Sequence, residues 1–564
     1  MIRYTSTKQI EIFTRRDGLR EFEHPFQTEL DPENRWVKLS KVLPWDELVE
    51  IYGRSLSKTK GKQSVDGRLA VGSLIIKHKQ GISDREVIEQ LKENIYLQYF
   101  AGFKGFKKES AFDASLFVEL RKRMGSDEFD EMSRKIIDKS EEVEKSQNAK
   151  SKLKNAESEK DKGSSGGSGL SRIKSEESKA GAEEPNEDQS NLPRAEKDYH
   201  STKTTGEENK TEAESKQTPA NKGKLKIDAT VSDQMIVYPT DVGLLNRARE
   251  ESERIIDFLY KESGIKTKPR TYRREARKAY LSVSKKKNKT KNEIRKAVGK
   301  QLRYLRRDIK HIHKLLDKFE GKGFPLNKRD QRIFWVIQLL YSQQEEMYRE
   351  KKHSVEHRIV NIYQPYVRPI PRGKEKASVE FGAKLGVSEV DGYVRINNLS
   401  WEAYNENSDL KKQVEDYKEQ YGYYPEVVLA DKIYLSRENR QYLQNLGIRL
   451  SGKPLGRPKE NESYYQKAKR RKENAQRNHI EGKFGQGKNA YGLSRIRARR
   501  KDTSESWIAA IFFVMNLVRL TKTAKIFFFF VSLVKKIQKV INKMYKSNET
   551  PIPPSVEAVL GLAI

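Results

Sequence analysis

The spacing of apolar residues in the first part of the chain is that of packed helices. The stretch from Arg68 to His78 is apolar enough for a buried helix, and Gly81 then opens a turn. Ser83 followed by Glu86 has the sequence of a capping box at the start of a second helix. Two helices joined by a short turn are compatible with a helix-turn-helix or with an ordinary helical hairpin. We predict a mainly α-helical N-terminal domain over residues 1–135.

The next stretch, residues 136–222, lacks any such pattern. From residue 140 to residue 222 the only aromatic residue is Tyr199, and Gly163 to Gly169 consists entirely of glycine and serine. A stretch of this composition cannot bury enough apolar surface to offset its chain entropy. We therefore predict a disordered low-complexity linker over residues 136–222.

Helical spacing returns further along the chain. Apolar residues three or four apart run from Ile294 to Leu316, and a second stretch of this kind runs from Asn327 to Glu350. Gly321 to Pro325 between them has the composition of a loop. We predict a helical insertion over about residues 240–370, compatible with a helical hairpin. Its polar face is basic, which fits either DNA contact or simple solvation.

Strand patterns occur on both sides of this insertion. Leu225 to Ile227 is a short apolar stretch before it. After it, Ala377 to Ser388 and Gly392 to Ile396 predict a hairpin, because the Asp-Gly pair between them is typical of a tight turn. Leu410 to Tyr421 then predicts a helix, and Glu426 to Ala430 predicts a strand buried inside a sheet.

The order of these elements indicates the fold of the C-terminal region. Strand, hairpin, helix, strand and helix, in that order, are typical of an RNase H-like α/β domain. We predict that this domain covers residues 223–540, that the helical insertion follows its first strand, and that residues 541–564 form a C-terminal tail.

The net charge of the chain indicates which class of partner it binds. The formal charge is +33, from 113 Lys and Arg against 80 Asp and Glu. Residues 140–222 contain 15 basic and 18 acidic residues, so the remainder carries +36. Nucleic acid is the expected partner, because basic side chains that neutralise phosphates release condensed counterions. The absence of Cys excludes disulfides and thiolate zinc sites such as zinc fingers.

The apolar segments do not predict membrane contact. The N-terminus lacks the apolar core of a signal peptide. Two apolar runs near the C-terminus, Trp507 to Val518 and Ile526 to Val534, are shorter than the roughly 20 residues that span a bilayer. We expect both runs to be buried and the protein to be cytoplasmic.

Three acidic residues are the candidates for chemistry. Asp228 and Asp431 each follow an apolar stretch, where we expect a buried strand to give way to a loop, and Glu481 follows a basic segment predicted to be helical. Carboxylates held at fixed points beside positive charge suit a two-metal nuclease. The alternatives are turn-capping roles for the two aspartates and a salt bridge from Glu481 to Arg477, one helical turn earlier.

These residues resemble those of the DDE transposases of bacterial insertion sequences, in the group that spans the insertion-sequence-four and insertion-sequence-five families. Ile227 to Thr230 and Ala430 to Tyr434 resemble the regions of the first and second Asp. The group's signature separates Tyr, Arg, Glu and Lys by two, three and six residues, and Arg477, Glu481 and Lys488 fit it. The Tyr position is Asn474, which departs from the signature. Residues 65–103 also resemble the N-terminal region of these transposases.

The resemblance implies a function and a set of site residues. The implied enzyme binds the terminal inverted repeats of an insertion sequence and cleaves and transfers strands with two Mg²⁺ or Mn²⁺ ions in each active site. The metal ligands and catalytic residues would be Asp228, Asp431 and Glu481. The implied DNA-binding residues are Arg477, Lys483, Lys488, Arg495 and Arg497. The N-terminal domain would also bind DNA, and the protein would act near the nucleoid as a homodimer or higher assembly on double-stranded repeat and target DNA.

Three other functions stay open on the sequence. A transposase-derived repressor would bind DNA without cleaving it, and a basic protein could act on RNA instead. His353 to His357 matches the His-x-x-Glu-His pattern of one zinc peptidase class. That pattern requires a continuous helix, whereas a Pro-containing extended stretch follows it here, so a peptidase is disfavoured.

Overall fold

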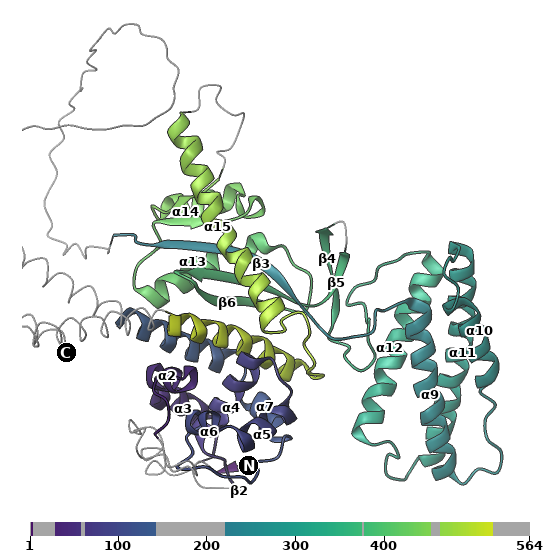
Figure 1. Cartoon of the computed structure of the whole chain (residues 1–564). Coiled ribbons are helices and arrows are strands. Elements are labelled where there is room, and N and C mark those ends of the chain that lie inside the picture. The colour runs from purple at the N-terminus through teal and green to yellow at the C-terminus, as the bar shows by residue number, and fades with distance from the viewer. Residues whose placement is uncertain are drawn as a thin grey trace, which may run out of the picture. The chain divides into compact units, whose positions relative to one another are not determined.

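The computed structural model describes residues 2–3, 29–57, 62–142, 220–374, 377–452 and 463–522. Most of the predicted linker, the second apolar run and the predicted C-terminal tail lie outside these residues. Within the described residues the chain combines a helical N-terminal region with a mixed α/β region (Figure 1).

The N-terminal region is built from short helices. They are α2 (Arg35–Val42), α3 (Trp45–Arg54), α4 (Gly67–Gln80), α5 (Asp84–Glu93), α6 (Ile95–Phe100), α7 (Leu116–Arg123) and a helix over residues 126–142. A parallel pair of two-residue strands, β1 (Ile2–Arg3) and β2 (Lys62–Gln63), accompanies them. Aromatic side chains lie at the centre of the core of these helices. The ring centroids of Trp36 and Trp45 lie 5.0 and 5.1 Å from the ring centroid of Phe100.

The turn between α4 and α5 is as predicted. Gly81 ends α4 with a φ of 68°, a conformation that glycine adopts at low cost. The Ser83 side chain then accepts a hydrogen bond from the backbone N–H of Glu86 and caps α5. The exposed side chains of α5 are Arg85, Glu86, Glu89 and Glu93. This acidic face opposes phosphate contact, so the pair fits an ordinary helical hairpin better than a helix-turn-helix.

The α/β region holds a six-stranded mixed sheet. Its strands are β3 (Lys224–Asp233), β4 (Arg368–Lys374), β5 (Ala377–Val390), β6 (Tyr393–Ser400), β7 (Val427–Leu429) and β8 (Arg449–Leu450). The order is β4-β5-β3-β7-β8, and β6 pairs with β5. β5 runs antiparallel to β3, β4 and β6, whereas β7 is parallel to β3 and β8.

The predicted hairpin and the helix and strand after it are present. β5 and β6 are joined by Asp391 and Gly392, whose φ values of 49° and 89° are those of a tight hairpin turn. The helix predicted after the hairpin is α13 (Asp409–Tyr421), and the next strand is β7. The remaining helical elements are η3 (Glu406–Ser408), η4 (Lys432–Tyr434), α14 (Arg437–Asn445), α15 (Tyr464–Ala490) and a helix over residues 501–522.

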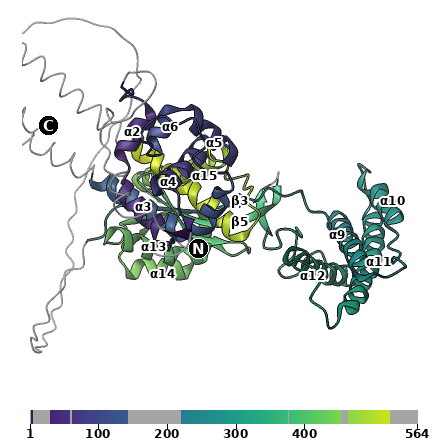
Figure 2. The same ribbon diagram turned by 90° about the horizontal axis from the view of Figure 1, so that it is seen from below.

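The helical insertion follows β3, as expected, and it contains more than a hairpin. Its helices are α9 (Asp241–Ser263), α10 (Arg273–Ser284), α11 (Lys291–Leu316) and α12 (Lys328–Glu350), with the short η2 (Asp317–Phe319) after α11. They lie side by side around an apolar core of their own (Figures 1 and 2). The predicted helices correspond to α11 and α12. The segment after α12 leads to β4, which begins at Arg368, close to the expected limit of about residue 370.

The N-terminal region and the sheet share one apolar core. This core joins side chains of α3, α4 and the helix over 126–142 to others of β5, β6 and the helix over 501–522, and Figure 2 shows the N-terminal helices beside that C-terminal helix. The helix over 126–142 continues past the predicted boundary at residue 135, because Ile136 and Ile137 are buried in the shared core.

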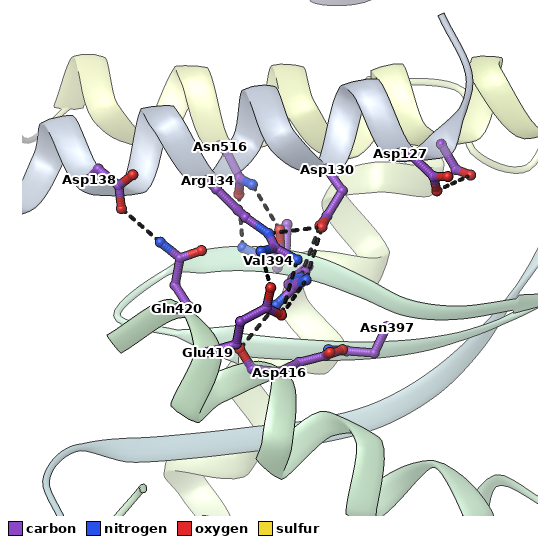
Figure 3. Close-up of polar contacts among 12 residues, drawn as sticks. Asp127, Asp130, Arg134, Asp138, Val394, Asn397, Asp416, Glu419, Gln420 and Asn516 are labelled. Carbon is purple, nitrogen blue, oxygen red and sulfur yellow. Dashed lines mark hydrogen bonds and ion pairs between the residues drawn. The ribbon is translucent and has the colours of Figure 1, made fainter. Parts of the chain in front are cut away.

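Polar contacts fix this packing (Figure 3). The Arg395 guanidinium on β6 donates two hydrogen bonds of 2.9 Å to the Asp130 carboxylate on the helix over 126–142. Asn516 exchanges two hydrogen bonds of 2.8 Å with the backbone of Val394. Paired in this way, these partly or fully buried polar groups hold the two regions in one orientation.

The first C-terminal apolar run is buried, as predicted. Ile508, Ile511, Phe513 and Leu517 lie on the helix over 501–522 and are 0 or 1 % exposed. None of the helices in the described ranges is long and apolar enough to cross a membrane.

Candidate active site

The alternation of side chains along β3 creates two different faces. Leu225 and Ile227 point into an apolar core with residues of α13. Lys224 and Asp228 have the opposite parity and contact α15, where Lys224 Nζ lies 3.1 Å from Gln476 Oε1. The sheet therefore separates α13 on one face from α15 on the other (Figure 1).

Asp228 lies in the middle of β3 and not at its end, which corrects the prediction from the sequence. The strand continues because its residues pair with β5 as far as Asp233 opposite Gly382. The other neighbour, β7, pairs only with residues 224–226, and its last pair is Lys226 with Leu429. Asp228 thus occupies the stretch of β3 that β7 leaves uncovered.

Asp431 follows the end of β7, as predicted. The parallel register places Lys226 beside Leu429, so Asp228 and Asp431 each lie two residues beyond the last pair. Asp228 and Asp431 therefore lie at the same height along the two parallel strands, at the carboxyl end of β7. Asp431 is exposed and precedes η4, whereas the Asp228 side chain is 17 % exposed.

Glu481 lies on α15, as predicted, and Arg477 links it to the first aspartate. Arg477 Nη2 lies 2.9 Å from Glu481 Oε1, and Arg477 Nη1 lies 3.7 Å from Asp228 Oδ2. The salt bridge considered as an alternative for Glu481 is therefore present. Arg477, Glu481 and Lys488 share one side of α15, because four and eleven residues are close to whole numbers of helical turns.

Burial controls the protonation of Asp228. Desolvation raises the pKa of this carboxyl group from 3.8 to about 6, although the Ala229 backbone N–H donates a 2.8 Å hydrogen bond to it. The Arg477 guanidinium lowers this pKa, whereas the negative charges of Glu406 and Asp431 raise it. A cation that approached Asp228, Glu406 and Asp431 would reduce the repulsion between their negative charges.

The donor set fits hard divalent cations in kind. Carboxylate oxygens are the preferred ligands of Mg²⁺ and Mn²⁺ in proteins. Within the described ranges no three His, Asp or Glu side chains form a group ready to hold a metal ion. Arg477 instead bridges Asp228 and Glu481. Direct coordination by both carboxylates would therefore require this guanidinium to release them.

The predicted DNA-binding residues divide into three groups. Arg477 contacts the carboxylates, as described above. Lys488, Arg495 and Arg497 line one cavity of about 730 Å³ beside the turn that precedes α5. Arg495 and Arg497 are exposed because buried Ile496, between them, forms a bridge with Gln234, the residue after β3. Lys483 is the third group by itself.

Lys483 is half-buried on α15. Burial lowers the pKa of its amino group, which the Glu389 carboxylate raises and the positive charge of Arg519 lowers. Lys483 is six residues from Arg477, so it lies on the far side of α15. A role of Lys483 in DNA binding stays a prediction.

Parts of the chain match two known families. Residues 428–518 match the family described as "Transposase DDE domain", and residues 24–123 match the "Transposase domain (DUF772)" family. The two matches support a bacterial insertion-sequence transposase.

A curated relative from Rhizobium meliloti, "Uncharacterized protein ORF8 in nfe locus", is 34% identical over 109 residues. The match covers 19% of this chain, and the chain spans about half, 52%, of the relative's length. No solved structure matches the chain.

The DDE match covers Asp431, Glu481 and the basic residues of α15 but not Asp228. Asp228 is joined to them by the strand register and by Arg477. Glu406, which raises the pKa of Asp228, was missed from the sequence. It is the first residue of the short η3 after β6, in a polar stretch where no strand end or periodicity marks it.

The zinc-peptidase motif is not formed. Residues 353–357 are not helical, and His357 has a φ of 50°. His357 Nδ1 lies 3.1 Å from Glu402 on another segment. Without a helix, the two histidines lack the one-turn spacing that the motif uses.

Proposed function

We propose that the chain is a DDE-type DNA transposase of the insertion-sequence-four and -five group. It binds the terminal inverted repeats of its element and cleaves and transfers DNA strands. One observation carries this proposal: Asp228 and Asp431 share a level of the sheet, and Arg477 connects Asp228 to Glu481. The two transposase matches support it.

The order of elements agrees with an RNase H-like catalytic domain. Strand β3 carries Asp228, the β5–β6 hairpin and α13 follow, β7 leads to Asp431, and α15 carries Glu481. A sheet that is covered by helices on both faces holds the carboxylates at fixed points, which a phosphodiester-cleaving site requires. In this proposal the helical N-terminal region also binds DNA. The protein acts near the nucleoid as an assembly of two or more subunits on the DNA.

Asp228, Asp431 and Glu481 would hold two divalent ions. When bound, such ions activate the attacking oxygen and stabilise the leaving oxygen of an in-line displacement. The partly buried Asp228 supplies a carboxylate whose ionisation is unfavourable without a cation. Arg477, once released from the carboxylates, remains beside them and can donate to a DNA phosphate. Lys488, Arg495 and Arg497 extend this positive surface.

Isosteric substitutions test the proposal. Asp228→Asn, Asp431→Asn and Glu481→Gln each remove a negative charge while keeping side-chain size. Strand cleavage of terminal-repeat DNA, assayed with Mg²⁺ or Mn²⁺, should fall by orders of magnitude in each variant. Binding to the same DNA without divalent ions should change little, because basic residues carry it.

Asp233→Asn is the matched control. Asp233 lies on the same strand as Asp228, but an odd number of residues away, so its side chain points to the opposite face. This variant should keep most of the cleavage activity. If all three site variants cleave like the unmodified protein, the carboxylates are not metal ligands and the transposase mechanism is rejected.

A further inference from the structure

A second cationic cavity lies away from the three carboxylates. It has a volume of about 990 Å³ and is lined by the segment from Met235 to Thr240, by α9 and α12 of the helical insertion, and by residues 360–364 and 499–500. The segment from Met235 to Thr240 directly continues β3, which carries Asp228. We call this cavity the insertion cavity.

The charge of the insertion cavity is one-sided. Its lining includes six cationic residues and no acidic one: Arg247, Lys328, Arg329, Arg332, Arg499 and Arg500. Arg500 is paired with Asp502, whereas Arg329 and Arg332 are exposed on the first turns of α12. The positive end of the helix dipole lies there, so cations at this place oppose helix stability and indicate a role in binding an anion.

The floor of the same cavity is apolar and exposed. Met235, Val237 and Tyr238 are 61, 79 and 73 % exposed. Three such side chains in four consecutive positions are costly to leave in water without a partner. The Tyr238 ring is held in place by an edge contact with Phe381, with ring centroids 5.6 Å apart.

We propose that the insertion cavity binds a separated strand of DNA, with phosphates on Arg329 and Arg332 and an unstacked base on Tyr238. Cations alone would fit a duplex backbone, but the base faces of a duplex are stacked away from an exposed aromatic ring. Single strands expose both groups, and proteins bind them with basic grooves and aromatic platforms. The cavity offers both kinds of side chain together.

This inference rests on the proposed transposase function, and it names the form of DNA that one part of the surface receives. Tyr238 is ten residues beyond Asp228 along an extended segment, so the two lie at most about 33 Å apart. One DNA molecule can therefore reach both places. The cavity would hold a strand that has separated near the cleavage point.

Binding without divalent ions tests the inference separately from cleavage. The full chain is titrated in a chelator with a duplex and with a forked duplex of the same sequence that carries an unpaired arm. Tyr238→Ala should weaken binding of the forked DNA by about 5- to 150-fold, as expected for one lost base stack, and leave the duplex within about twofold. Tyr238→Phe keeps the ring and should bind like the unmodified protein.

The cations are tested with the same two DNAs. Arg329→Ala combined with Arg332→Ala should lower the salt slope for the forked DNA by about 1.4, the value for two single-strand phosphate contacts. Phe324→Ala and the pair Lys287→Ala and Lys289→Ala are controls, because these exposed residues do not line the cavity. They should leave forked binding unchanged.

Three results would overturn the inference. Equal losses on both DNAs in Tyr238→Ala would mean that the cavity receives a duplex. Unchanged binding to both would mean that the cavity receives no nucleic acid. If the unmodified protein binds single-stranded RNA more tightly than the forked DNA of the same sequence, the ligand of the cavity is RNA. A failure of the proposed function would give a different result. The unmodified protein would not cleave terminal-repeat DNA, while Tyr238→Ala would still weaken binding of the forked DNA alone.

Discussion

Two aspartates with raised pKa values, a partly buried one in the sheet and a fully buried one in the helical insertion, occupy opposite kinds of site. Asp228 lies beside other carboxylates, Arg477 and a backbone donor, at the edge left open by β7. Asp308 lies inside the bundle on α11 with its side chain 0 % exposed. Neither oxygen of Asp308 has a hydrogen-bond partner among the described residues.

The difference shows how burial can serve a function or only cost stability. Burial raises the pKa of Asp308 to about 8, with a smaller contribution from Glu253, against the lowering effect of Arg249. At Asp228 burial raises the pKa only to about 6. A cation that binds at the open edge of the sheet can offset the cost of the buried negative charge of Asp228. Asp308 is enclosed by helices, so protonation is the main way to avoid that cost.

The largest stability effect predicted from this comparison belongs to Asp308. Its folded pKa exceeds the usual 3.8, so the folded state holds a proton that the unfolded state loses between about pH 4 and pH 8. The contribution of this carboxyl to the free energy of unfolding is therefore most favourable below pH 4 and falls as the pH rises to 8, by on the order of 6 kcal/mol. Asp308→Asn should remove this loss in denaturant unfolding measured at several pH values.

Cleavage activity should separate the two aspartates further. Asp308→Asn should cleave terminal-repeat DNA at nearly the unmodified rate at pH 7, because it lies in the separate core of the insertion. If unfolding of the variant and the unmodified protein shows the same pH dependence, the Asp308 carboxyl is solvated in the folded protein and the contrast with Asp228 disappears.

The position of Asp308 could have been read from the sequence, whereas that of Asp228 could not. Asp308 is three residues after Leu305 and four before Ile312, on the apolar stripe that predicted α11. Asp228 was placed at a strand end because its pairing with β5 joins residues more than 150 positions apart. Local patterns do not encode such a pairing.

Other elements show the same division between local and distant information. The Asp391–Gly392 turn and the cap on Ser83 were predictable because a few adjacent residues specify each geometry. The half-buried setting of Lys483 and the approach of Glu406 to Asp228 depend on contacts that only the packed sheet creates. Of the candidate site, the residue types and their order were therefore predictable, but the bridge through Arg477 to Asp228 was not.

A smaller stability effect is expected at Asp228. Its folded pKa of about 6 also exceeds 3.8, so this carboxyl lowers stability as the pH rises from about 4 to 6, by on the order of 3 kcal/mol. Asp228→Asn should recover this loss. Mg²⁺ should recover part of it in the unmodified protein and not in the variant, as measured by thermal unfolding with and without the ion. Equal Mg²⁺ effects in both proteins would show that the ion binds elsewhere.

The smallest predicted effect concerns Arg477. Its guanidinium lies 3.7 Å from Asp228 and lowers the pKa of that carboxyl group, so Arg477→Met should raise this pKa above about 6. The shift should stay modest because burial, and not the guanidinium, is the largest influence on Asp228. Carboxyl ¹³C chemical shifts of labelled aspartate, followed through a pH titration without divalent ions, report it directly. Asp308 is the internal reference in the same spectra, since Arg477 is not among the groups that influence it. An unchanged Asp228 titration would mean that Arg477 serves Glu481 alone, and a shift at both aspartates would mean that the variant disturbs the fold.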